Sequence, residues 1–427
     1  MKKFINIFLL LVLLIFTLSA CGNNSHNSSD ITTETNSAKI WDGTIASAFE
    51  NGIGTKESPY EIANPPQLAF FAKTVNEGTT YSDKHIVLTN DIDLNNIEWT
   101  PIGNGINSFE GCFDGNEKAI KNLKITSGVK YNYEFPKGKK STYCSFGFFA
   151  TIQNAEVKNL LIDNAEIMIN LSDNVISTHA GILCGGLRTY DTSSTISNIK
   201  IQNSIISTDC AEYSPSELII GGAIGHIYSS ENTNTDIDLL ETNITVSFED
   251  GYGSVNNVGA IIGRALIDYS DLSIENSASY LNLKISKEQC YYTFTKNIFG
   301  AIGTSQASKK PFSIKNMFSK LTITAPQNNV GAYPTAYIAN AILGDAHYFA
   351  LKDDPTAIGY NFENVFGCVT QINAETNEET TLTTLYDLPE GPNFSQLNCQ
   401  GCESLPENHN LDKEIWDISD LSNPKLR

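Results

Sequence analysis

Short segments in which apolar and polar residues alternate recur along most of the chain. Two of them are CSFGFFATIQNAEVKNLLID, from Cys144 to Asp163, and FGAIGTSQASKKPFSIKNMFSKLTI, from Phe299 to Ile323. A period of two in stretches rich in Ile, Val, Leu and Thr indicates β-strands with one buried face. The Ser, Asn, Asp and Gly clusters between them are typical of turns, and no repeat contains a helical period of useful length. The pattern therefore predicts an all-β chain.

Two elements return in most of the repeats. The first is an apolar tetrad or pentad bounded by glycine, and it occurs at Gly181–Gly185, Gly222–Gly225, Gly259–Gly263 and Gly300–Gly303. The second is an asparagine before a run of alternating apolar residues, and it occurs at Asn122, Asn159, Asn198, Asn276, Asn316 and Asn364. Recurrence with a period of roughly 20 to 50 residues indicates a solenoid.

Short strands, tight corners and a repeating register together predict a parallel β-helix, in which each repeat forms one turn of the coil, or rung. A rung cannot bury its own inner face, but rungs stacked about 4.8 Å apart share a continuous core. Asparagine tolerates the left-handed conformation of a corner, and stacked asparagines can bond one another along the axis. We therefore expect the six asparagines to form one structural column, with Asp238 where the Gly221 repeat lacks its asparagine.

The ends of such a coil need caps. Pro65 and Pro66 open an amphipathic stretch, Gln67–Asn76, and Gly78 follows it, which are start and stop signals of a helix. We predict a short N-terminal capping helix whose apolar stripe is Leu68, Phe71, Ala72 and Val75. The expected organisation is a cap with the first rungs over residues 41–110, β-helix repeats over 111–369 and a C-terminal closing segment over 370–427.

The glycine-bounded tetrads and both ends of the repeat region resemble the bacterial surface proteins built on GLUG-motif repeats. The opening segment matches at WDG from Trp41, GTKESPYEI from Gly54, DIDL from Asp91, WTPIG from Trp99 and FDGN from Phe113. The closing segment matches at WDIS from Trp416 and PKL from Pro424. The resemblance covers nearly all of residues 41–427 and implies a right-handed β-helix on a secreted or cell-surface protein. It transfers no catalytic residue, because the repeat family has no shared active site to map.

The first residues have the pattern of a secretory signal. Lys2 and Lys3 precede an apolar run from Phe4 to Ala20 that ends in small residues and is slightly too short for a spanning helix. The alternative is a membrane anchor that is retained. A polar stretch rich in Asn, Ser and Thr follows, so we expect residues 21–40 to form a disordered tether.

The end of the apolar run, Leu18-Ser19-Ala20-Cys21, resembles the lipobox of bacterial lipoproteins. In that family the cysteine thiol takes a diacylglycerol and the chain is cut before it. The resemblance implies a lipoprotein signal peptide over residues 1–20, lipidation of Cys21, and an extracytoplasmic protein anchored by lipid to the bacterial cell membrane. An ordinary cleavage site that happens to precede a cysteine is the alternative.

Charge narrows the classes of partner. The 427 residues carry a formal charge of −20, and only Arg188, Arg264 and Arg427 of the 28 basic residues are arginines. We therefore expect no binding of nucleic acid, or of anionic polysaccharide through a basic face. Four cysteines lie in apolar runs, where a reduced cysteine acts as a small apolar residue: Cys112, Cys144, Cys184 and Cys368.

Metal sites have weak support in the sequence. Asp91 and Asp93 could offer oxygen ligands to calcium, but the glycine and glutamate of a calcium loop do not follow, and strand alternation explains the pair as well. Cys399 and Cys402 form a lone CxxC, for which a small disulfide or two free thiols are the more economical interpretation than zinc. We predict no metal and no cofactor.

Two sets of side chains are candidates for a site. The residue after the second glycine of each motif is His226, Arg264, Thr304 or Asp345, so these side chains should stack on successive rungs. His226, Arg264 and Asp345 are weak catalytic candidates, and four exposed corner residues are the alternative interpretation. A tyrosine lies a few residues beyond each of four glycine elements, and we predict a ligand-binding aromatic strip of Tyr190, Tyr228, Tyr269 and Tyr348. The alternative is that each ring folds over the edge of the core.

The sequence contains no phosphate-binding loop, nucleophile elbow or HExxH motif. We therefore favour a non-enzymatic surface lipoprotein whose β-helix is a binding or adhesion surface for glycan or a surface protein. The alternative is a β-helix enzyme that degrades a neutral polysaccharide, which only fold analogy supports. A structural spacer without a ligand is the third hypothesis.

Overall fold

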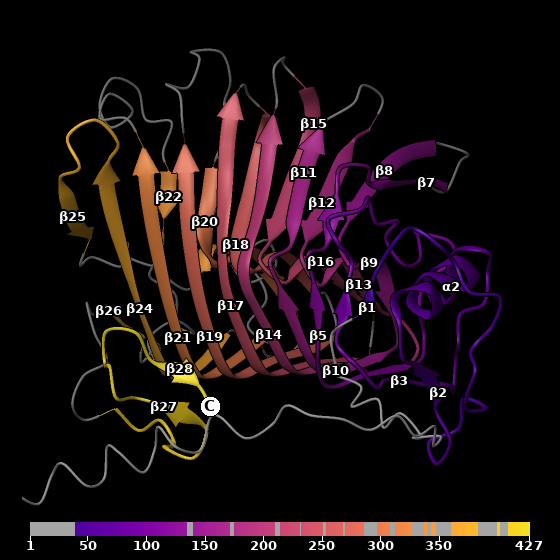
Figure 1. Cartoon of the computed structure of the whole chain (residues 1–427). Coiled ribbons are helices and arrows are strands. Elements are labelled where there is room, and N and C mark those ends of the chain that lie inside the picture. Colours follow the sequence, from indigo (N-terminus) through magenta and orange to yellow (C-terminus); the bar gives the residue numbers. More distant parts are fainter. Residues whose placement is uncertain are drawn as a thin grey trace, which may run out of the picture. The chain divides into compact units, whose positions relative to one another are not determined.

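Parallel pairing between successive repeats winds the described part of the chain into a β-helix (Figure 1). In the computed structural model, each long strand of the first sheet lies between the strands of the preceding and following rungs, as β10 lies between β5 and β14. The main run of this sheet is β5 (Cys112–Lys121), β10 (Glu156–Asp163), β14 (Ser194–Asp209), β17 (Asn234–Asp250), β19 (Asp271–Ile285), β21 (Phe312–Ala325) and β24 (Tyr360–Asn373). The predicted all-β class and parallel β-helix are confirmed.

The structure describes residues 39–134, 140–170, 175–209, 214–230, 232–250, 253–267, 270–285, 297–307, 312–325, 337–339, 343–346, 360–382, 399–401 and 409–427, all within the unit Ala38–Arg427. Shorter strands extend the first sheet: β1 (Lys39–Ile40), β2 (Tyr60–Ile62), β3 (His85–Leu88), β4 (Ile92–Asp93), β6 (Lys124–Ile125), β11 (Glu166–Asn170), β25 (Glu379–Leu382) and β26 (Cys399–Gly401). Among the described residues, no helix is long and apolar enough to cross a membrane.

The second sheet has two arms that follow one another in each rung. The first arm contains β8 (Lys140–Phe146), β12 (Ser177–Gly181), β15 (Ser214–Gly221), β22 (Tyr337–Ala339) and the first halves of β18 (Gly253–Ile267) and β20 (Asn297–Ala307). The second arm contains β9 (Phe149–Gln153), β13 (Cys184–Thr189), β16 (Ile224–Ser229), β23 (Leu343–Ala346) and the second halves of β18 and β20. β7 (Val129–Glu134) pairs antiparallel with β8 at one end.

The glycine-bounded motifs join the two arms, and their glycines are needed for steric reasons. A Cβ on Gly259, the first glycine of its motif, would lie 1.8 Å from the carbonyl oxygen of Ile262. A Cβ on Gly263, the second glycine, would lie 2.7 Å from Cγ2 of Ile219 in the first arm. The chain therefore turns back on itself at the first glycine, and the outward faces of the arms come close at the second. We call this line of close approach the crease.

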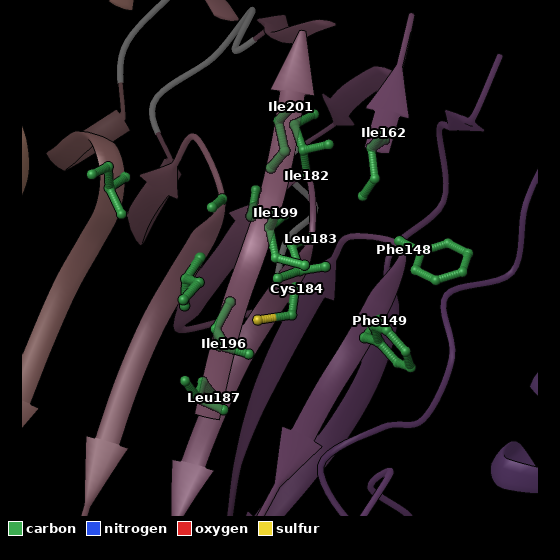
Figure 2. Packing of buried hydrophobic residues seen from close by; sticks show 14 of the residues in the cluster. Phe148, Phe149, Ile162, Ile182, Leu183, Cys184, Leu187, Ile196, Ile199 and Ile201 are labelled. Carbon is green, nitrogen blue, oxygen red and sulfur yellow. The ribbon is translucent and has the colours of Figure 1, made fainter. Parts of the chain in front are cut away.

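The apolar residues between the glycines point into the core. Ile182, Leu183 and Cys184 are fully buried, and they share one large cluster with Ile196 and Ile199 of β14 (Figure 2). Burying a side chain of this size contributes about 1.5 to 3 kcal/mol. Among the described cysteines, Cys112, Cys144, Cys184 and Cys368 are free and buried, in agreement with their apolar sequence context.

The predicted capping helix is present as α2 (Pro65–Asn76) (Figure 1). Its N-cap, Asn64, accepts a hydrogen bond from the backbone N–H of Gln67, and prolines occupy its first turn. Phe71 stacks on Phe113 of β5, with ring centroids 5.9 Å apart, and also contacts Phe109. The apolar stripe of the helix therefore covers the core at the first rungs.

The C-terminal segment packs against the side of the coil. β27 (Trp416–Asp417) and β28 (Lys425–Leu426) form an antiparallel pair beside β17 and β19. Trp416 is fully buried in a second cluster with Tyr280, Phe318 and Phe366, which face away from the main core. The closing segment thus covers an outward apolar patch of the first sheet.

Asparagine side chains form hydrogen-bonded rows at the corners of the coil. Asn198 donates to Asn159 at 2.9 Å, and Asn316 donates to Asn276 at 3.0 Å. Asn364 continues the row by donating to Asn316 at 3.0 Å. These residues have φ values from 46° to 54°, the left-handed region that the sequence analysis assigned to the corner.

Asn122 lies outside this row, so the prediction of one column of six asparagines is wrong at this residue. Its neighbour Lys121 pairs with Asp163, which places Asn122 opposite Asn164 at a second corner, and Asn164 donates to it at 2.7 Å. The reason is a shift of register between β5 and β10 beside Asn159. Where one rung contains extra residues, the spacing of asparagines along the sequence does not show which of the two corners each asparagine occupies.

The gap in the row is occupied by Leu239, and not by Asp238 as the sequence analysis expected. The register places Leu239 opposite Asn198, with φ of 53°. Asp238 lies beside the row, where its carboxylate accepts a hydrogen bond from Asn276 at 2.9 Å. A leucine in this conformation is strained by about 1 to 2 kcal/mol, because its Cβ approaches the following carbonyl oxygen.

We predict that Leu239→Asn raises the free energy of unfolding by about 1 kcal/mol, because asparagine tolerates the left-handed conformation and can complete the row. Urea denaturation of the purified protein measures the change. Leu239→Ala is the matched control, since it removes the leucine side chain but keeps the strained conformation. Equal stability of the asparagine and alanine variants would contradict the prediction.

Candidate functional site

The strand register places the predicted His226 column on neighbouring strands. His226 of β16 lies opposite Arg264 of β18, Arg264 lies opposite Thr304 of β20, and Thr304 lies opposite Asp345 of β23. The alignment of glycine motifs therefore identified the correct positions. For Thr304 and Asp345 the description extends to the backbone alone, and Tyr269, Tyr348 and Cys21 lie outside the described residues.

Strand alternation shows that this column faces away from the core. Leu187, Ile227 and Ala265 follow one another in register and belong to the buried core cluster. Their sequence neighbours on either side, including His226 and Arg264, must point outward, because successive side chains of a strand alternate between faces.

The first arm contributes outward side chains to the same place. The rings of His179 on β12 and His226 on β16 meet edge to face, with centroids 4.7 Å apart. Nη1 of Arg264 lies 2.6 Å from Oε1 of Glu217 on β15. Ser177 hydroxyl oxygen lies 2.9 Å from Nε2 of His179. We call these five residues from both arms, Ser177, His179, Glu217, His226 and Arg264, the inter-arm cluster.

Arg188 and a set of tyrosines border the inter-arm cluster. Arg188 donates from Nη1 to the carbonyl oxygen of Gly105 at 2.8 Å, and its guanidinium lies 5.4 Å from the ring centroid of Tyr131. Arg188 also pairs in register with Tyr228, whose ring centroid lies 5.7 Å from that of Tyr190. Tyr228 is 42% exposed, so the predicted aromatic strip has a solvent-facing member next to an arginine.

Several buried polar atoms in this region have no hydrogen-bond partner among the residues that the structure describes. They are Nε2 of His226, Nε of Arg264, the hydroxyl of Ser145 on β8 and the hydroxyl of Thr151 on β9. Ser145 pairs in register with His179, and Thr151 pairs with Gly186, which in turn pairs with His226. An unpaired buried polar atom costs free energy, and a bound water molecule or polar group that paired with it would offset this cost.

The two histidines are neutral at physiological pH. Burial lowers the pKa of His179 to about 3, with help from the positive charges of Arg188 and Arg264. Burial also holds the pKa of His226 well below 6.5, and His179 and the two arginines act in the same direction. The positive charge of the inter-arm cluster therefore resides on its arginine, with a second positive charge on neighbouring Arg188.

Ser177, His179 and Glu217 do not have the geometry of a hydrolase triad. In a triad the acid accepts from the second ring nitrogen of the histidine, and the histidine takes the serine proton. Here the carboxylate of Glu217 lies 3.4 Å from the Ser177 hydroxyl itself. The depressed pKa of His179 also makes it a poor general base. This arrangement fits binding better than acyl transfer.

The other candidates of the sequence have structural partners. The Asp91 carboxylate accepts hydrogen bonds from Lys121 at 2.8 Å and from the backbone N–H of Ala119 at 3.0 Å. Asp93 accepts from Asn122 at 2.7 Å. Within the described ranges, no group of three or more metal-ligating side chains occurs. A pocket of about 570 Å³ beside α2, lined in part by Asp42 and Glu50, contains none of the predicted site residues.

The contribution of the first arm to this cluster was not predicted. No pattern in the sequence singled out Ser177, His179 or Glu217. The signal that was present is strand alternation, since His179 lies two positions before Gly181 and faces outward. The angle between the two arms could not be predicted from the sequence. This angle brings residues before a glycine motif into contact with residues after it.

The comparisons support the fold and identify no family. No protein-family model matches the chain. A stretch of 180 residues, 39% of the chain, is 29% identical to halomucin of Haloquadratum walsbyi but covers 2% of that protein. The structure of a putative immunoglobulin A1 protease from Bacteroides ovatus superposes with a TM-score of 0.53 at 18% identity, over 89% of this chain and 95% of that one. This likeness shows the same β-solenoid fold.

Proposed function

We propose that this protein is an extracytoplasmic binding protein whose outward face around Tyr190 and Tyr228 binds carbohydrate. The observation that carries the proposal is the pair of tyrosine rings, one of them 42% exposed, beside Arg188 and the inter-arm cluster. Aromatic faces suit the flat apolar surfaces of sugar rings, and nearby polar groups can fix their orientation.

Rigid strands hold the proposed surface. Tyr228 lies within β16, and the backbone N–H of Tyr190 donates to Oδ1 of Asn154 at 2.8 Å. The hydroxyl of Ser230 donates to the carbonyl oxygen of Tyr190 at 2.5 Å. These bonds fix the loop that carries Tyr190, so little conformational entropy is lost on binding. Similarity to a protein named halomucin and the resemblance to GLUG-repeat surface proteins support an extracellular setting.

Anchoring is the second part of the proposal. The lipobox-like sequence ending in Cys21 supports attachment to the membrane through lipid. Metabolic labelling with radioactive palmitate should mark the wild-type protein, and Cys21→Ala should abolish the label. Equal labelling of the two proteins would reject the anchor and leave the binding surface to be judged separately.

Carbohydrate binding is tested on a glycan array with the purified protein. For a glycan that binds, Tyr228→Ala should weaken the affinity by about fivefold to tenfold, since an aromatic contact contributes on the order of 1 kcal/mol. Ile53→Ala is the control, because Ile53 is an exposed apolar residue, 66% accessible, on the N-terminal cap. Absence of any glycan ligand would reject the proposal, and capture of a surface protein by the same face would replace it.

A second assay on the glycans that bind tests the alternative of a polysaccharide-degrading enzyme. A reducing-sugar assay with each bound glycan detects new chain ends. Their appearance, and their loss in His226→Gln, would change the conclusion from binding to catalysis.

A further inference from the structure

The N-terminal cap contains a pocket that shares no residue with the inter-arm cluster or the tyrosine surface. Its volume of about 570 Å³ lies in the range of pockets that bind small molecules. The lining residues with polar side chains are Asp42, Thr44 and Glu50 in the loop after β1, and Asn64 and Gln67 at the start of α2. The backbone N–H of Ala46 donates to the carbonyl oxygen of Pro66 at 2.9 Å, so the loop and the helix are held together.

Two carboxylates of this pocket are open to solvent. Asp42 and Glu50 are both exposed, and neither forms an ion pair with another described residue. Hydrogen bonds from the hydroxyl and the backbone N–H of Thr44 hold the pKa of Asp42 below its usual value, so this side chain is ionised at neutral pH. The described lining contains no lysine or arginine, and the pocket is therefore negatively charged.

The start of α2 does not counter this preference for a cation. Helix N-termini bind anions through free backbone N–H groups. Here the first two positions are Pro65 and Pro66, which have no N–H, and the N–H of Gln67 donates to Oδ1 of Asn64 at 3.1 Å. The donors that an anion would need are therefore missing or already paired.

Gln67 adds a polar group that the fold does not use. Its side chain lines the pocket although the residue is only 1% exposed, and its Oε1 accepts from the backbone N–H of Ala63 at 2.7 Å, which fixes the amide. The other end of the amide, Nε2, bonds to no residue that the structure describes, and it is not one of the unpaired atoms closed off from solvent. A ligand in the pocket can therefore accept a hydrogen bond from Nε2 and offset the cost of leaving it unpaired.

We propose that this pocket is a second carbohydrate site, which binds an amino sugar with a free ammonium group, such as a glucosamine unit. The ammonium group donates to the carboxylates of Asp42 and Glu50, and the amide of Gln67 donates to a hydroxyl oxygen of the sugar. The apolar side of the sugar ring packs against the prolines of α2. This inference goes beyond the tyrosine surface and does not depend on it.

Other cations fit the pocket less well. A metal ion needs several oxygen ligands at short range, and the part of the chain that the structure describes has no group of three or more metal-ligating side chains. A simple alkylamine, such as a lysine side chain, would use the carboxylates but would leave Nε2 of Gln67 unpaired. An amino sugar uses both the charged and the neutral groups.

The test compares ligands that differ in one group. Oligosaccharides of β-linked glucosamine and their N-acetylated forms are titrated by calorimetry slightly below neutral pH, where a sugar amine is protonated. The wild-type protein should bind the free-amine form about fivefold or more tightly, as expected for exposed ion pairs with two carboxylates. Ethylamine, which has the charge without the hydroxyl groups, should bind more weakly than glucosamine.

Asp42→Asn and Glu50→Gln should each lower the preference for the free-amine form by about twofold to threefold, and the double variant should abolish it. Glu57→Gln is the matched control, because Glu57 is an exposed carboxylate on the same cap that does not line the pocket. It changes the net charge by the same amount and should leave the preference unchanged. Circular dichroism verifies that each variant is folded.

The remaining outcomes each contradict the proposal. Equal binding of the two sugar forms, or the same loss in Glu57→Gln as in Asp42→Asn, would overturn the site. Ethylamine binding as tightly as glucosamine would overturn the assignment to an amino sugar. The preference should persist in Tyr228→Ala, and its loss there would place the amino sugar at the tyrosine surface. Failure of the tyrosine surface to bind any glycan would leave this pocket unaffected.

Discussion

Gly259→Ala should lower the free energy of unfolding by at least about 3 kcal/mol, because its Cβ would lie 1.8 Å from the carbonyl oxygen of Ile262 and 2.4 Å from its carbonyl carbon. No rotamer change can relieve this contact, since both partners are backbone atoms. The turn between the arms must open to accept the methyl group, which separates the hydrogen-bonded strands above and below.

Gly186→Ala is the matched control within the same sheet. The added methyl group has no neighbour closer than 3.9 Å, so the variant should be as stable as the wild type, or more stable by up to about 1 kcal/mol. Urea denaturation followed by circular dichroism measures both variants. Equal destabilisation by the two substitutions would mean that these glycines serve backbone flexibility in general, and that Gly259 is not required for the tight turn between the arms.

The same contrast explains what the sequence could reveal about the fold. Glycines at a fixed spacing indicate a repeated turn of the backbone, and the apolar residues between them indicate which side of that turn is buried. The β-helix and the stacking of His226, Arg264, Thr304 and Asp345 could therefore be predicted from spacing. The register shift beside Asn159 could not, because extra residues in one rung leave the alternating pattern unchanged. Asn122 was therefore assigned to the wrong corner.

The backbone conformation of Leu239 could not be predicted from the sequence either. A leucine in a strand-like stretch gives no sign that its φ is 53°, and only its place between Asn198 and Asn276 in the structure identifies the strain. The inter-arm cluster could be predicted only in part for a similar reason. The sequence located His226 and Arg264 on one strand face, but the partners that define their chemistry, His179 and Glu217, lie on the other arm.

Stability should fall as the pH is lowered from 6.5 to 5, and His179 should be a main cause. The unfolded chain binds a proton on this side chain with a pKa near 6.5, whereas burial and the two arginines lower its pKa to about 3 in the folded protein. Below pH 6.5 the unfolded state therefore holds more protons than the folded state, and acid favours unfolding. His226 acts in the same direction, because its pKa is also depressed.

The magnitude follows from linkage. One histidine of this kind contributes a slope of about 1.4 kcal/mol per pH unit between pH 6.5 and pH 3, or about 2 kcal/mol by pH 5. Most carboxylates stay ionised over that interval, so the histidine term can be isolated there. His179→Gln should reduce the slope of the free energy of unfolding against pH by that amount, and the ring protons of His179 should not titrate between pH 8 and pH 5 in the nuclear magnetic resonance spectrum. An unchanged slope in the variant would show that the crease admits a charged imidazole, and would remove the reason for assigning the positive charge of this site to its arginines alone.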